Sequence, residues 1–487
     1  MKKLKFNTAK QLAALLLLVG LASASCKKML DINTDPNNYT DVPVTTLLPA
    51  AEVNLAFTLG GNASRYAGSF VQHYGGHRGQ PVQYGQYNFD PSQSDNFWSS
   101  MYAGVLRDLR TIIDKSRVTG DSMYVGAAQI LSAHTFSVLT DMYGDIPFTD
   151  ALNGVGSITP KYDKQEDIYP ALINLLTAGA ANVKSGTGRK PGTDDVLYGS
   201  IAAAPAWGTA WEKAANSLKL RLLNHLSKVQ PTAAQDFLST NPLLISSNAE
   251  NAKVTFGTIE ANANPIHSFD ELSGRKDNAV ANTIIDKMKS LTDPRIPRYF
   301  YPVKKGASAG QYLGNVPGGD NDDAGETKFS RPGPAFASIG SPIMFVSYAE
   351  VQFIIAEVRL RTGNIPDATT AYNNAITADF LYVGNTSTEA ATHLAKPAVA
   401  FNGSLQRLME QKWIVMFQAP YEAWTDWRRT GFPVLAPAAV NLTDGVIPRR
   451  IPYPQLEVNL NRANLEAGPG VPVPFESLKQ RVWWDKP

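Results

Sequence analysis

Two aromatic-rich stretches of the chain carry the residues best suited to binding a polar ligand. Tyrosine, histidine and side-chain amides recur from His73 to Phe89, and three more tyrosines lie between Tyr299 and Tyr312. Aromatic rings can stack on the C–H faces of a sugar while amides, acids and arginine bond its hydroxyl groups, in sites that are mostly preformed and concave. The candidate ligand-binding residues are His73, Tyr74, Arg78, Tyr84, Tyr87, Tyr299, Tyr301 and Tyr312.

The stretch from His73 to Phe89 also contains several glycines, which predict an exposed loop. The alternative interpretation is that its aromatic side chains pack the loop onto its own domain. Trp98 and Tyr102 have helical spacing, and we expect both in the core.

No metal site is expected from the histidines. His73 and His77 are spaced as two ligands on one helical face would be. Gly75 and Gly76 stand between them and argue against a helix.

The acidic residues Asp320, Asp322 and Asp323, with Gly325 behind them, resemble the start of a calcium-binding loop. Arg331 stands where such a loop ends in glutamate. A solvated turn is therefore the favoured interpretation, with a bound calcium ion as the alternative. We expect no other cofactor, and no pair of carboxylates is singled out as catalytic.

The first residues predict export and lipidation. Lysines precede an apolar run from Leu12 to Ala22, which is too short for the roughly 20 residues of a membrane-spanning helix. Small residues follow, and Cys26 is the only cysteine of the chain. We therefore expect a signal peptide over residues 1–25, a lipidated Cys26 as the mature N-terminus, and a tether over residues 26–45 rich in turn formers.

Charge and hydropathy exclude two other classes. The formal net charge is +2, and four of the positive charges lie in the predicted signal peptide. A nearly neutral mature surface gives no electrostatic case for nucleic acid. No later segment is apolar enough over 18 residues to span a membrane.

Helical periodicity dominates the rest of the chain. Apolar residues recur at helical spacing over about 205–229, 346–361 and 405–417, and a return helix is expected from Ala368 to Ile376. Helix, glycine turn and antiparallel helix form a tetratricopeptide-like unit. We expect one mainly all-α domain over residues 46–487, a scaffold of helical hairpins with long irregular insertions. Those insertions are about 72–95, 183–204, 257–278, 300–342 and 430–475.

Polar residues on these helices are interpreted as structural. Asn216 and Arg221 lie mostly off the apolar stripe, so we expect them to bond neighbouring loops. Arg428 and Arg429 are expected to lock their helix to the irregular part of the protein, with an arginine paired to Asp426.

A series of motifs, in this order from end to end, resembles the SusD/RagB-like outer-membrane lipoproteins, specifically the second, starch-binding-associated SusD-like group. After Cys26, the matching segments are Leu30–Asn37, Trp211–Lys213, Asn216–Arg221, Asp293–Arg295, Ser347–Phe353, Ala356–Glu357, Gln411–Trp413, Glu422–Gly431, Ile447–Pro448, Arg450, Tyr453–Pro454 and Val482–Asp485.

The resemblance implies a SusD-like scaffold of four tetratricopeptide units with an irregular ligand-binding half. It further implies a lipid-anchored protein of the outer membrane, at the cell surface, that forms a lid on a SusC-like TonB-dependent transporter. Such a lid captures an oligosaccharide, or in some members a peptide, and delivers it without chemical change.

Three alternatives stay open. A peptide-binding lid would have the same architecture. A helical glycosidase or lyase would also be secreted and aromatic-rich, but it needs two carboxylates facing each other across a cleft. A purely structural surface repeat protein would bind no ligand.

Overall fold

The structure, a computed structural model, describes residues 42–487. The predicted signal peptide, the lipidation of Cys26 and nearly all of the 26–45 tether lie outside these residues. Residues Val44–Pro487 form one unit. In this part of the chain no helix is both long and apolar enough to cross a bilayer.

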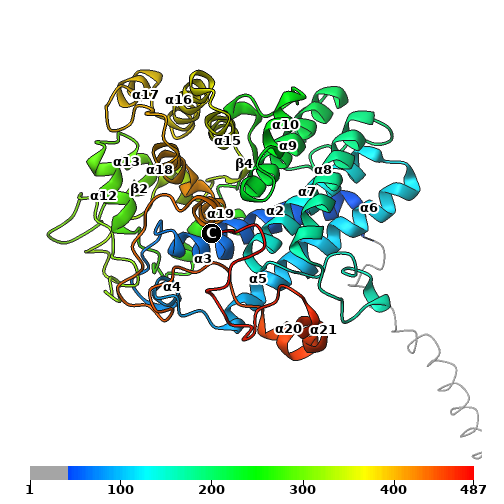
Figure 1. The fold of residues 1–487 in the computed structure, drawn as a ribbon, viewed down its shortest axis with the longest axis horizontal. Helices are drawn as coiled ribbons and strands as arrows, with labels where there is room; N and C mark the ends of the chain where they lie inside the picture. The colour runs from blue at the N-terminus through cyan, green and yellow to red at the C-terminus, as the bar shows by residue number, and fades with distance from the viewer. Residues whose placement is uncertain (1–41) are drawn as a thin grey trace, which may run out of the picture. The chain divides into compact units, whose positions relative to one another are not determined.

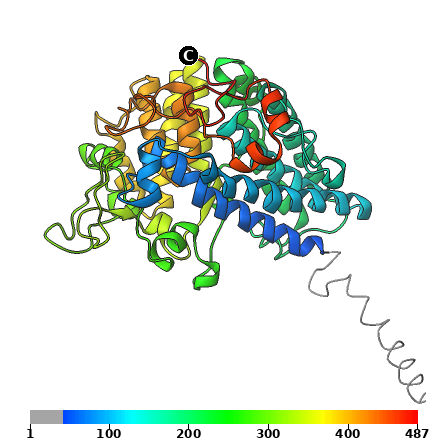
Figure 2. The ribbon, with the colours of Figure 1, turned by 90° about the horizontal axis from the view of Figure 1, so that it is seen from below.

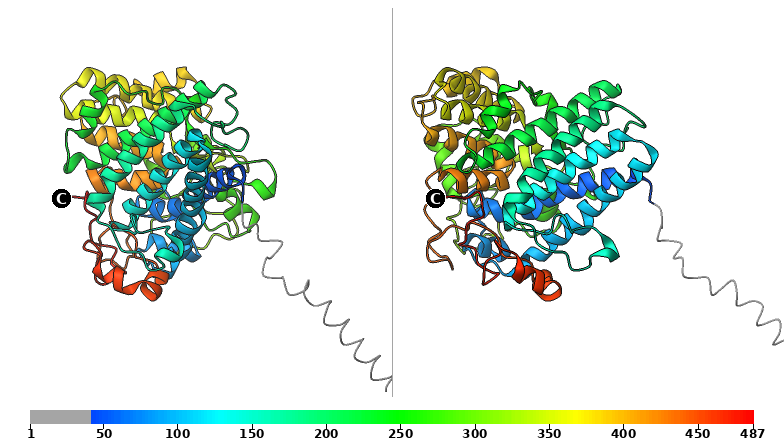
Figure 3. Two further views of the ribbon diagram at one scale, coloured as in Figure 1. Left: turned by 90° about the vertical axis from the view of Figure 1, so that its right-hand side faces the viewer. Right: turned by 45° about the vertical axis from the view of Figure 1, so that its right-hand side comes forward.

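The described chain is mainly α-helical, as predicted. Its longest helices pack side by side in sequence order (Figures 1 and 3). They are α2 (Val44–Thr58), α6 (Arg107–Thr119), α7 (Ser122–Tyr143), α8 (Gln165–Ser185), α9 (Ala204–His225), α15 (Tyr348–Arg361) and α16 (Ile365–Tyr382). Figure 2 shows α2 running alongside α6.

Shorter helices flank this array. Those between and after the long helices are α3 (Ser64–Phe70), α4 (Gly79–Gly85), α5 (Asp95–Ser99), α10 (Ala233–Ser239), α17 (Ser387–Leu394), α18 (Leu405–Val415), α19 (Pro420–Thr430), α20 (Gln455–Leu460) and α21 (Arg462–Ala467). The helices α11 (Pro265–His267), α12 (Asn282–Ser290), α13 (Ile296–Tyr299) and α14 (Pro334–Ala337) belong to an irregular region between α10 and α15.

The described chain also contains short π-helical and 3₁₀-helical segments. The π-helical turns are η1 (Leu59–Ala63), η3 (Ser100–Leu106) and η8 (Ser268–Leu272). The 3₁₀ turns are η2 (Pro91–Ser94), η4 (Gly154–Gly156), η5 (Leu226–Lys228), η6 (Asn248–Glu250), η7 (Glu260–Asn262) and η9 (Met416–Gln418).

Strands occur in two short antiparallel pairs among the described residues. β1 (Ala252–Val254) pairs with β4 (Ile343–Val346), with an irregular register after Ala252. β2 (Phe300–Tyr301) pairs with β3 (Arg331–Pro332), so that Tyr301 lies opposite Arg331.

The predicted hairpin of two helices is present, with shifted bounds. The Ser347 hydroxyl accepts a hydrogen bond from the Glu350 N–H and begins α15, because it satisfies an otherwise unpaired N–H at the helix N-terminus. Val346, which the periodicity placed in this helix, is instead the last residue of β4. Gly363 adopts a φ of 76° between α15 and α16, a conformation in which a side chain would be strained.

Glycines allow the helices α7, α8 and α9 to approach closely. A Cβ atom on Gly126 of α7 would lie 2.7 Å from the carbonyl oxygen of Gly179 in α8. A Cβ atom on Gly208 of α9 would lie 2.6 Å from the carbonyl oxygen of Val183. These contacts leave no room for a methyl group, so the array is close-packed at its centre.

The polar motif residues bond other elements, and the arginines among them are buried. Asn216 donates to the Leu243 carbonyl oxygen of a loop at 3.0 Å, as predicted. Arg221 was also expected to bond a loop, but it instead pairs with Glu350 of α15. Arg429 pairs with Asp426 at 2.8 Å, and Arg428 donates to the Arg449 carbonyl oxygen at 2.9 Å in the irregular C-terminal stretch. The prediction that this pair locks α19 to irregular structure is confirmed for Arg428 alone, because Arg429 instead joins α19 to Glu357 of α15 at 2.7 Å.

Candidate functional site

A cavity of about 680 Å³ lies in the irregular region between α10 and α15, near β2 in Figure 1. Its volume falls within the range of small-molecule binding sites. The predicted insertions 257–278 and 300–342 supply its walls. The lining residues are Ile266, His267, Asp270, Glu271, Lys276, Tyr301, Pro302, Val303, Lys304, Gly310, Glu326, Phe329, Arg331, Pro332, Ala337, Ser338 and Ile339.

One wall is the helical turn formed by α11 and η8. The Asn264 side chain begins this turn by accepting hydrogen bonds from the N–H groups of Ile266 and His267, at 2.8 and 3.2 Å. Residues three and four apart share a helical face, so the turn presents His267, Asp270 and Glu271 to the cavity together.

The second wall is formed by the antiparallel pair β2 and β3, which places the ring of Tyr301 opposite the guanidinium group of Arg331. Tyr301 is 40% exposed, and its hydroxyl lies 3.3 Å from Ser338 Oγ. Arg331 lies across the strand pair, and the half-buried ring of Phe329 precedes it. This wall therefore offers exposed aromatic surface beside polar groups, which suits a ligand with both apolar faces and hydroxyls.

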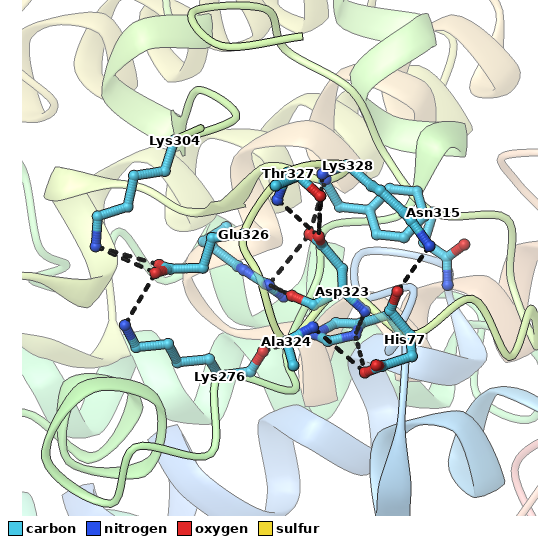
Figure 4. Close-up of polar contacts among 12 residues, drawn as sticks. His77, Lys276, Lys304, Asn315, Asp323, Ala324, Glu326, Thr327 and Lys328 are labelled. Atoms are coloured by element: carbon cyan, nitrogen blue, oxygen red, sulfur yellow. Dashed lines mark hydrogen bonds and ion pairs between the residues drawn. The ribbon is translucent and has the colours of Figure 1, made fainter. Parts of the chain in front are cut away.

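The rim of the cavity carries a cluster of lysines around one carboxylate (Figure 4). Glu326 accepts from Lys276 at 3.0 Å and from Lys304 at 3.2 Å. Partial burial raises the pKa of Glu326, but the bonds from Lys276 and Lys304 outweigh it, and the pKa is lowered overall. The carboxylate is therefore ionised at neutral pH and neutralises part of the lysine charge.

The loop behind the rim is organised by Asp323 (Figure 4). Its buried carboxylate accepts hydrogen bonds from the N–H groups of Thr327 and Lys328 at 2.7 and 3.0 Å. It also accepts from the N–H of Phe329 at 3.1 Å and pairs with Arg331 at 3.4 Å. These bonds fix the residues on either side of Glu326.

His77 ties this loop to the segment before α12. Its Nδ1 accepts from the Asp323 N–H at 2.9 Å, and its Nε2 lies 2.6 Å from the Lys276 carbonyl oxygen (Figure 4). A carbonyl oxygen only accepts, so Nε2 carries the proton and the ring is neutral. Burial, the largest cause, lowers the pKa of His77 and favours this neutral form.

The electrostatic environment of Asp270 differs from that of the other lining acids. Burial raises the pKa of Asp270 to about 7, and the Arg331 guanidinium opposes this rise only in part. Its Oδ1 accepts from Asn278 Nδ2 at 3.0 Å.

The expectation of an exposed loop from His73 to Phe89 is wrong. Residues 79–85 form α4, and four candidates are buried, being 0–4% exposed: His73, Tyr74, Tyr84 and Tyr87. Each of them contacts other rings of the core. The alternative interpretation, in which the aromatics pack this segment onto its own domain, describes the structure.

The glycines of this segment have a different role from the predicted one. A Cβ atom on Gly75 would lie 2.7 Å from the Asn315 carbonyl oxygen and 2.9 Å from Ala281 Cα. Glycine is thus present because two distant backbone segments press against it, and local sequence holds no signal for that contact.

The other four candidates divide between core, cavity and surface. Tyr299 is fully buried and donates to Asp379 at 2.7 Å. Tyr301 lines the cavity. Arg78 and Tyr312 are partly exposed and do not line it, although Arg78 donates to the Arg275 carbonyl oxygen.

In the acidic run at 320–325, Asp320 and Asp322 are exposed, and Asp323 alone is buried in the loop. Asp323 already holds three N–H groups and Arg331. Within residues 42–487 no three His, Cys, Asp or Glu side chains are grouped to hold a metal ion.

Sequence reasoning missed most of the cavity. His267, Asp270, Glu271, Glu326, Phe329 and Arg331 stand in no recognisable motif, and only the length of the two insertions pointed to their region. The pairing of β2 with β3, which brings Tyr301 to Arg331, involves strands too short to be recognised by periodicity.

The structure is therefore an array of paired helices with a ligand-sized cavity in an irregular insertion. The chain belongs to the SusD-like family, because the second SusD-like family model, described as starch-binding associating with outer membrane, matches residues 36–454.

Solved structures agree with this assignment. A chitin-binding protein is 26% identical, with a TM-score of 0.75 over 90% of this chain and 100% of its own. A SusD homologue from Bacteroides uniformis is 25% identical, with a TM-score of 0.75 over 91% and 99%. A chitin-binding SusD homologue from Flavobacterium johnsoniae is 24% identical and shares the fold, with a TM-score of 0.76 over 91% and 97%. A comparison with curated proteins found no match.

Proposed function

We propose that this protein is a lipid-anchored, surface-exposed glycan-binding protein of the outer membrane. It captures an oligosaccharide in the cavity beside Tyr301 and passes it to a SusC-like TonB-dependent transporter. The single observation that carries the proposal is the cavity of about 680 Å³ with the exposed Tyr301 ring at its wall. The family description and the chitin-binding titles of two similar structures support a glycan as the ligand.

Binding without catalysis is part of the proposal. Of the three lining acids, Glu326 is already engaged by Lys276 and Lys304, which leaves Asp270 and Glu271 side by side on one wall. A general acid and its partner would both have to reach the ligand.

The test of ligand binding is calorimetry with chito- and malto-oligosaccharides. Tyr301→Ala removes the exposed ring and should weaken binding about 10-fold or more, as loss of a stacked aromatic does. Tyr312→Ala is the matched control, because Tyr312 lies in the same insertion but outside the cavity lining. Equal effects of the two substitutions would place the ligand elsewhere.

Two further measurements separate the alternatives. Chromatography of the sugars after long incubation should show no shorter products, and products that depend on Asp270 would establish an enzyme instead. Peptides that bind with the same Tyr301 dependence, when sugars do not, would establish a peptide-binding lid. Purification from outer membranes should recover a TonB-dependent transporter identified by mass spectrometry.

A further inference from the structure

The charged side chains that line the cavity are unequally paired. Three are bases, and each has an acidic partner: Lys276 and Lys304 bond Glu326, and Arg331 pairs with Asp323. Of the acids, Glu271 lies 3.9 Å from Lys276. For Asp270, no basic side chain of residues 42–487 lies within ion-pair distance.

The hydrogen bonds of Asp270 are also incomplete. Oδ1 accepts from Asn278, but no donor to Oδ2 is present among the described residues. Asp270 is 6% exposed and lines the cavity. Oδ2 is not among the fully buried side-chain atoms that lack a partner, so it reaches the cavity, where a ligand can supply the donor.

His267 adds a second acceptor to the same helical face. Its Nδ1 lies 3.2 Å from the Ala337 carbonyl oxygen, so Nδ1 carries the proton. In the neutral ring Nε2 is then an acceptor. Together with Asp270 and Glu271, this wall is rich in acceptors, and a matching ligand has to bring the donors.

Burial raises the pKa of Asp270 more than the neighbouring charges lower it. The guanidinium groups of Arg331 and Arg65 favour its ionised form, whereas Asp277 disfavours it, and desolvation outweighs them all. A positive group placed directly on Oδ2 would stabilise the carboxylate, whereas a second carboxylate there would repel it.

We propose that Asp270 sets the specificity of the cavity, favouring sugars that carry an amino group and disfavouring sugars that carry a carboxylate. The inference rests on the proposed function and specifies its substrate class. The ammonium group would bond Asp270 Oδ2 while the sugar ring packs on Tyr301.

The experiment compares three oligosaccharides of equal length by calorimetry at neutral pH: one of glucosamine, one of N-acetylglucosamine and one containing glucuronate. The wild-type protein should bind the glucosamine oligomer about 10-fold more tightly than its acetylated counterpart, as expected for one charge-assisted hydrogen bond. It should bind the glucuronate-containing oligomer most weakly.

Asp270→Asn keeps the size of the side chain and its bond from Asn278, and should abolish the preference for the amine. Asp286→Asn is the control, because it removes the same charge from an exposed position of α12 outside the cavity. It should leave the preference intact. Thermal melting of each variant confirms that it is folded.

Proton release is a second readout that a structural role would not change. In the free protein Asp270 is partly protonated near neutral pH, and pairing with an ammonium group ionises it. Binding of the glucosamine oligomer should therefore release protons from Asp270, against the uptake by the sugar's own amines, and this release is measured as the difference between wild type and variant in the dependence of the binding enthalpy on the buffer. Asp270→Asn should lose this release.

The possible outcomes separate this inference from the proposed function. Tyr301-dependent binding of all three sugars, without preference or proton release, overturns the role of Asp270 alone. A preference that survives in Asp270→Asn also overturns it. Failure of every sugar to bind the wild-type protein overturns both.

Discussion

The Arg221 guanidinium donates two hydrogen bonds of 2.6 Å to the Glu350 carboxylate, joining α9 to α15 across 129 residues of sequence. Both side chains are buried, with 1% and 2% exposed. Glu422 of α19 lies 3.3 Å from the same guanidinium. Arg221 therefore connects α9 to both α15 and α19, and no local sequence pattern indicates these contacts.

Arg221→Met should be strongly destabilising, because it leaves Glu350 buried without its paired cation and removes one of the two cations beside Glu422. We expect a loss of about 3–5 kcal/mol in the free energy of unfolding, measured by urea denaturation. The double variant Arg221→Met/Glu350→Leu should recover part of this loss. The exposed pair of Arg110 and Asp114 is the control, and Arg110→Met should cost under about 1 kcal/mol.

The stability of the protein should fall in mildly alkaline solution because of His225. Burial lowers the pKa of this ring, but Asp141 at 3.3 Å and Glu422 at 3.1 Å outweigh burial and raise it to about 9. The stabilisation is complete below the ordinary histidine value of 6.5 and is lost as the pH rises through about 9.

The measurement is urea unfolding of the wild-type protein and His225→Gln across this pH range. The advantage of the wild type should shrink by about 3 kcal/mol. An advantage that stays constant from pH 6.5 to above 9 would show that the ring is neutral in the folded protein.

Calcium should not stabilise the protein, because the Asp323 carboxylate is already saturated by three N–H groups and Arg331. We expect the melting temperature to be the same with excess calcium and with EDTA, since a ligand of the native state raises it with concentration. A concentration-dependent rise that Asp323→Asn abolishes would establish a calcium loop here.

Cys26→Ala should release the protein from membranes without unfolding it, because the described fold begins after this position, with α2 at Val44. Fractionation after salt and alkaline washes measures the release, and circular dichroism checks the fold. A variant that stays in the membrane pellet would contradict anchoring through this cysteine.

The helices were predictable because their apolar stripes are local. Trp207, Trp211 and Leu218 repeat at helical spacing, and they are buried in α9 as expected. The periodicity placed the end of this helix at about residue 229, whereas the α-helix ends at His225 and a 3₁₀ turn follows.

The cavity was predictable only as a region. Tyr301 was a candidate among eight residues, and nothing in the sequence separates it from Tyr299, which turns inward to Asp379. Tyr299 is the last residue of α13, whereas Tyr301 lies in the two-residue strand β2, and no sequence pattern reveals this change of element. Asp270 became recognisable only when the packing showed which acid lacks a basic partner.

All the cavity-lining residues come from one contiguous stretch of the chain, Ile266 to Ile339, while the long helices supply none of them. The residues that line the cavity can therefore change in related proteins while the residues of the long helices stay the same. Exchange of the lining residues of this segment would change the specificity of the proposed site without altering any residue of the long helices.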